Sequence, residues 1–141
     1  MADGWNKSVS QVSGIVRLML EDNGEVAASL RINPADVKLA QRCQKVSEEL
    51  SNIADMLPDD ATIDDAVKFN DTIEDKICYL LGYNAKQDLF GQISATAIMP
   101  DGRMFVTHLM EMIHEMIAPE ISKRTQAMAQ AVEKHTAKYT K

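Results

Sequence analysis

The chain has no excess of positive charge. It carries 15 Lys and Arg residues against 21 Asp and Glu residues, which gives a net charge of −6 at pH 7. Proteins that bind the phosphate backbone of nucleic acid need Lys and Arg clustered on one face. This balance argues against nucleic acid as a partner. The acidic charge is concentrated between residues 55 and 75, where eight acids accompany one base, Lys68, a pattern typical of a solvated acidic rim.

Long apolar runs and cysteines are also scarce. No run approaches the roughly 18 apolar residues that indicate a membrane span, and the N-terminal residues contain no apolar segment of secretory type. We therefore expect neither membrane insertion nor export by that route. Cys43 and Cys78 each fall inside an apolar periodic segment and lack metal-ligand companions. We interpret them as small buried hydrophobic residues, which predicts a reducing, cytosolic compartment.

Catalytic and metal-binding motifs are absent or incomplete. There is no Gly-rich phosphate loop and no internal repeat. The spacing Glu111-x-x-His114 is that of di-iron bundles, but such sites need two copies and two further glutamates facing the bundle interior. The paired aspartates at 59–60 and 64–65 are better explained by a helix start, where carboxylates complement the helix dipole. We expect no metal, no cofactor and no enzymatic activity, and predict an interaction protein.

The N-terminal third predicts a β-hairpin. Two apolar runs between residues 14 and 32 flank Asn23-Gly24, a strong hairpin signal. A two-residue loop would place Glu21 and Arg17 on the apolar face. We therefore favour a three-residue loop, residues 22–24, which pairs Leu20 with Val26, Leu18 with Ala28 and Val16 with Leu30. The first strand also fits a short helix.

Four main helices are predicted after the hairpin. The first has Asn33 as N-cap and Pro34 at its first position. The second starts at Thr62, with Asp65 three residues on, and ends at Gly82. A short helical turn over 84–91 carries Leu89 and Phe90, residues 93–99 are extended or a loop, and 100–102 form a turn. The third main helix lies between Asp101 and Pro119, and the fourth follows Pro119. The apolar seams of the first two helices consist of Leu39, Cys43, Val46, Leu50, Ile53 and Leu57, and of Ile63, Ala66, Asn70, Ile73, Ile77 and Leu80.

The helix before Pro119 is unusually rich in methionine. It holds four of the nine methionines, and its apolar stripe covers nearly half of the helical cylinder. A methionine-rich surface adapts to apolar helices of differing sequence, although core filler is the simpler explanation. The candidates for partner binding are Phe105, Leu109, Met110, Met112 and Met116, some of which must belong to the core.

The predicted fold is mainly α with a small N-terminal β-hairpin (α+β), the four main helices packing as a small bundle. Residues 1–13 form an N-terminal arm, and residues 14–119 form the hairpin and helical core. Residues 120–141 form a basic C-terminal helix that is partly exposed. Asn70, in the second seam, either fixes register or belongs to a rotated helix with Val67 and Phe69 at the core border.

Taken in order, these elements resemble the tail assembly chaperones of long-tailed bacteriophages of Gram-positive hosts. The resemblance rests on the hairpin leading into Asn33-Pro34-Ala35-Asp36, on the acidic helical middle, and on the apolar-Gly segments 73–82 and 89–91. In that family the first such segment ends in Phe-Gly. Leu81 precedes Gly82 here, a departure from the pattern.

The resemblance implies a protein that coats the hydrophobic tape measure protein before the tail tube polymerises. It further implies self-association, and contact with tail tube protein through a frameshifted extension. The location would be the host cell cytoplasm, with absence from the mature virion. The alternative from the residues is a small helical dimerisation or adaptor protein, such as a phage-encoded regulator of a host protein, using the 39–57 seam between subunits.

Overall fold

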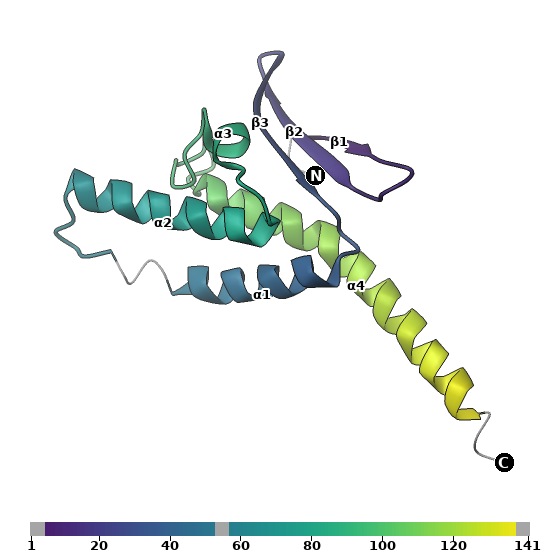
Figure 1. Ribbon diagram of the computed structural model, residues 1–141. Coiled ribbons are helices and arrows are strands. Elements are labelled where there is room, and N and C mark those ends of the chain that lie inside the picture. Colours follow the sequence, from purple (N-terminus) through teal and green to yellow (C-terminus); the bar gives the residue numbers. More distant parts are fainter. Residues whose placement is uncertain (1–4, 53–56, 138–141) are drawn as a thin grey trace.

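A three-stranded antiparallel sheet rests against helices of very unequal length (Figure 1). The computed structural model describes residues 5–52 and 57–137. Strands β1 (Trp5–Val9), β2 (Val16–Asp22) and β3 (Glu25–Ile32) lie side by side in that order. The helices are α1 (Val37–Ser51), α2 (Ile63–Leu81), α3 (Lys86–Phe90) and α4 (Phe105–Ala137). The α+β class is confirmed. None of the described helices is long and apolar enough to cross a membrane.

The sheet has one strand more than the predicted hairpin. Residues 5–9, which the sequence places in an N-terminal arm, form β1 and pair with β2. Trp5 is buried, and its ring stacks on Phe105 at 6.5 Å between centroids. Phe90 meets the same Phe105 ring edge-on at 6.1 Å. These aromatic contacts join β1, α3 and the start of α4.

The predicted hairpin register is wrong. The loop has two residues, Asn23 and Gly24, both with positive φ (54° and 83°), and Glu21 pairs with Val26. A bulge then shifts the register, so that Leu20 pairs with Ala28 and Leu18 with Leu30. The extra residue is Ala27, and it is buried like Ala28 beside it. The bulge lets the tight turn and the apolar face coexist, a combination that neither simple register allows.

The start of α1 also differs from the prediction. Asp36, not Asn33, is the N-cap, and its carboxylate accepts a hydrogen bond from the amide of Lys38 at 2.9 Å. The side chain of Asn33 instead accepts from the amide of Ala35, forming a turn that leads from β3 into the helix. Within the seam, Leu39, Cys43 and Val46 are buried in the core of the same chain. Ile53 lies outside the described residues.

The second helix begins and ends where the sequence predicts. Thr62 and Asp65 form a capping box, and Gly82 ends the helix in the left-handed conformation with φ 82°. The short helical turn is confirmed as α3, with Leu89 and Phe90 buried. The seam of α2 is buried only in its second half, at Ile73, Ile77 and Leu80.

The predicted break at Pro119 is wrong, because α4 runs continuously from Phe105 to Ala137. The two predicted C-terminal helices are therefore one. Its first half carries the core residues Leu109, Ile113 and Ile117, while its second half projects away from the rest of the molecule (Figure 1). A closed bundle of four main helices is not what the described residues form. The core lies between the inner face of the sheet, α1, α2, α3 and the first half of α4.

Candidate partner-binding groove

The methionine-rich stripe of α4 is divided between core and surface. Phe105 and Leu109 are 1% and 0% exposed and belong to the core cluster, so a partner cannot reach them in this structure. Met110, Met112 and Met116 are half-buried and pack against the edge of that cluster. The five candidates are therefore not brought together on one accessible surface.

A groove with a volume of about 260 Å³ lies between the end of α1, the middle of α2 and the start of α4. Its walls are mainly apolar, and its rim is polar. The apolar walls are formed by Leu50, Ile73, Met104, Val106 and Met110. The rim is formed by Ser47, Ser51, Thr107, Glu111 and His114.

The groove lies where α1 packs against both α2 and α4. A salt bridge between Glu49 and Lys76 joins α1 to α2 one residue from Leu50. On the other side, Nε2 of His114 lies 2.8 Å from Oγ of Ser47, which joins α4 to α1. These two polar contacts connect α1 to both neighbouring helices beside the groove. They do not cover its apolar walls.

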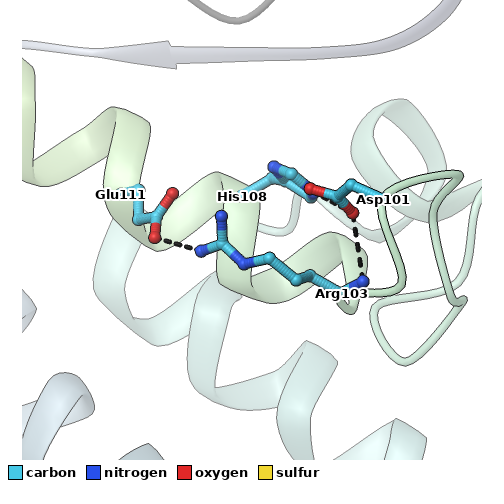
Figure 2. A network of polar contacts seen from close by, with 4 residues as sticks. All are labelled: Asp101, Arg103, His108 and Glu111. Carbon is cyan, nitrogen blue, oxygen red and sulfur yellow. Dashed lines mark hydrogen bonds and ion pairs between the residues drawn. The ribbon is translucent and has the colours of Figure 1, made fainter.

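A network at the start of α4 fixes the helix that carries Met110 and the residue before it, Met104 (Figure 2). The carboxylate of Asp101 accepts a hydrogen bond from the amide of Arg103 at 3.0 Å and lies 2.9 Å from Nε2 of His108. The hydrogen bond with His108, followed by the one from the Arg103 amide, lowers the pKa of Asp101. Arg103 in turn forms an ion pair with Glu111. The turn at 100–102 is thus tied to the first two turns of the helix.

The Glu-x-x-His pair is used for these structural contacts. Glu111 faces Arg103, whereas His114 faces Ser47. Over residues 5–52 and 57–137, no three or more His, Cys, Asp and Glu side chains gather in a way that could hold a metal ion. Burial raises the pKa of the Cys43 thiol, and Ser47 offsets this in part. A raised pKa favours the neutral thiol, the opposite of an activated nucleophile.

The sequence and the structure share one groove residue, Met110. Sequence reasoning missed Leu50 and Ile73, because both occupy seam positions that predict simple burial. Leu50 is half-buried in the last turn of α1, whereas Ile73 is 0% exposed. That Leu50 and Ile73 line one groove depends on how α1 and α2 pack together, and the sequence of neither helix specifies that packing.

Comparison with known proteins finds no matching family model, no matching curated protein and no matching solved structure. The functional argument therefore depends on the residues and the groove.

Proposed function

We propose that this protein is a tail assembly chaperone that binds apolar helices of a tape measure protein and keeps that client soluble. The supporting observation is the groove, whose apolar walls include Met104 and Met110 and whose rim is polar. Its volume is below the range of roughly 300–1,000 Å³ found for small-molecule sites. It suits a few side chains projecting from one face of a helix, as in helix-in-groove recognition.

Methionine explains how one groove can serve many client segments. The side chain is flexible and polarizable, so Met104 and Met110 re-pack against helices that differ in sequence. A single groove of this size binds weakly. Many copies along one long client gain affinity from avidity, which fits a coating function.

The alternative of a dimerisation or adaptor module gains no support from the described residues. Its proposed interface was the 39–57 seam, but Leu39, Cys43 and Val46 of that seam are buried within their own chain. That surface is not free to pair with another subunit.

The test is co-expression with a tape measure protein, comparing wild type with Met110→Glu and Met112→Glu. Both methionines are half-buried on α4, but only Met110 lines the groove. An unpaired carboxylate is costly in an apolar groove, so Met110→Glu should weaken client binding at least tenfold, a cost of about 1.4 kcal/mol or more. The soluble client is measured by size-exclusion chromatography with light scattering, after circular dichroism has verified both folds.

Two results would contradict the proposal. A client that stays insoluble with the wild-type chain would rule out the chaperone function. If both variants fold and lose binding equally, the client does not bind in this groove.

A further inference from the structure

The outer face of the sheet carries two arginines directly opposite each other. Arg17 of β2 and Arg31 of β3 are partners in the strand register, and both are exposed. Leu18 and Leu30, the next residues inward from the pair, are buried in the core. Because side chains alternate between the two faces of a sheet, Arg17 and Arg31 point away from the core on the same side.

The two arginines form the type of cross-strand pair in which side chains lie closest. The backbone amide of Arg31 donates to the hydroxyl of Tyr83 at 2.9 Å, so it does not bond to the strand of Arg17. Residues that face each other without hydrogen bonds between them have Cα atoms only about 4.5 Å apart. Like charges at such positions repel each other and destabilise the sheet. An anion bound between the two side chains would remove this repulsion.

No acid among the described residues relieves the repulsion. Over residues 5–52 and 57–137, neither guanidinium group forms an ion pair or a hydrogen bond. The guanidinium group of Arg31 lies over the ring of Tyr83, 4.3 Å from its centroid. A guanidinium group that stacks on a ring still presents its N–H donors at its edge. Both arginines are therefore free to donate to a bound acceptor.

The arginines line a pocket with a volume of about 260 Å³. It lies where β2 and β3 meet Tyr83 and α3, the short helix beside β3 (Figure 1). Ser29 and Tyr83 contribute hydroxyl groups to the wall. The apolar part of the wall is formed by Met19, Val26 and Leu30. The pocket thus combines a group of donors with an apolar surface.

The charges of the lining indicate the class of ligand. Arg17 and Arg31 supply two positive charges and Asp88 of α3 supplies one negative charge, which leaves the lining with a net charge of +1. One negative charge on a ligand balances it, whereas a phosphate dianion exceeds it and is repelled by Asp88. A carboxylate carries one charge, and its two oxygens match the planar donor fork of arginine.

We propose that this pocket binds a small carboxylic acid, with its carboxylate between Arg17 and Arg31 and an apolar arm against Met19 and Val26. The volume is below the range of roughly 300–1,000 Å³ found for larger organic ligands, so the arm is short. A ligand that binds only the folded chain also stabilises it. The inference goes beyond the proposed function, because the pocket shares no residue with the client groove.

The test is a titration of the full chain with hexanoate at neutral pH, followed by nuclear magnetic resonance of the backbone amides. Hexanol, which has a similar arm without the charge, and inorganic phosphate, which has charge without an arm, are titrated in parallel. The amides of Ser29 and Arg31 belong to the pocket wall and report where binding occurs.

The titrations compare wild type with Arg17→Gln and Lys68→Gln. Both variants remove one positive charge from an exposed side chain, so both are expected to fold. Lys68 lies on α2 and does not line the pocket, which makes Lys68→Gln the matched control. Thermal denaturation without ligand measures the stability of all three chains.

Hexanoate should shift the amides of Ser29 and Arg31 in wild type and in Lys68→Gln, with a Kd in the millimolar range that suits so small a ligand. Arg17→Gln should bind it at least tenfold more weakly, and hexanol and phosphate should bind wild type at least tenfold more weakly than hexanoate. Without ligand, Arg17→Gln should unfold at a temperature a few degrees above that of wild type, because the repulsion is removed. Higher stability together with lost binding separates a binding role of Arg17 from a structural one.

Any of the following results would overturn the inference. Hexanoate that shifts neither amide of wild type does not bind in the pocket. Equal binding of hexanol would mean that the arginines take no part, and tighter binding of phosphate would assign the pocket to another class of anion. Unchanged affinity in Arg17→Gln, or a lower unfolding temperature than that of Lys68→Gln, would remove Arg17 from the binding site.

Discussion

At the scale of single residues, Asn70 shows how a polar side chain in an apolar seam is used. Its amide nitrogen donates to Glu74 at 2.8 Å, and its oxygen accepts from the backbone amide and the hydroxyl of Thr96. Glu74, the one buried charged residue among those described, also accepts from the amide of Ala95. The two side chains supply partners to a loop that would otherwise bury unpaired amides.

Replacing Asn70 with Leu should lower the free energy of unfolding by about 1–3 kcal/mol. The substitution leaves the amide of Thr96 and the carboxylate of Glu74 without this partner, and buried unpaired groups carry that cost. Urea denaturation followed by circular dichroism measures it. Thr72→Ala, which removes an exposed hydrogen bond on the same helix, is the control. A loss no larger than that of the control would contradict the role assigned to Asn70.

At the scale of elements, Pro119 interrupts the hydrogen bonding of α4 without ending the helix. Proline has no amide to donate to the carbonyl of Glu115, and inside a helix this costs about 3 kcal/mol. Ile117 is buried and Ile121 is half-buried against the core, one turn apart on either side of the proline. Their packing favours a continuous helix across the site, and the exposed position of Pro119 lets water reach the unpaired carbonyl.

Pro119→Ala should therefore strengthen the helix beyond the core. We expect slower amide hydrogen exchange over residues 120–131 and a higher unfolding temperature, because the missing hydrogen bond is restored. Ser122→Ala, three residues further on, should change stability by only a few tenths of a kcal/mol, through helix propensity. Unchanged exchange in Pro119→Ala would mean that the proline does not weaken the tail.

The elements that the sequence predicts correctly are those with local determinants. Thr62, Asp65 and Gly82 specify the ends of α2 through contacts within a few residues. The prediction of the hairpin register failed because the turn residues and the apolar pattern favour different pairings. The bulge at Ala27 satisfies both. The predicted break at Pro119 failed because the packing of Ile117 and Ile121 on the core outweighs the tendency of proline to end a helix. Such competition is decided by the assembled core, which a single segment does not contain.

At the scale of the whole molecule, the same limit applies to the groove. The stripe on α4 is wide enough to face two neighbours, and the sequence cannot tell which side each neighbour takes. The ring of Phe105 packs against the rings of Trp5 and Phe90, which lie 100 and 15 residues earlier in the chain. Met110 instead lines the groove, together with residues of α1 and α2. The division of the stripe follows from the positions of four other elements, β1, α1, α2 and α3.

Removing residues 122–141 should leave the folded body intact. Among the described side chains, the core cluster and the residues packed against it end at Ile121, so the unfolding temperature should change by no more than a few degrees. A longer deletion, of residues 116–141, removes Ile117 and Ile121 and should lower it clearly. Thermal denaturation of both truncated chains measures this. A large loss of stability in the shorter deletion would place the tail within the cooperative fold.

One unbroken helix carries both Met110 and Met128, and this has a metric consequence. At the rise of about 1.5 Å per residue of an α-helix, the two side chains are separated by about 27 Å along the axis. A spectroscopic label attached at residue 128 would therefore stand at a fixed offset from the groove of the same chain. The distance from that label to a second one at residue 110 would report whether the helix stays unbroken across Pro119.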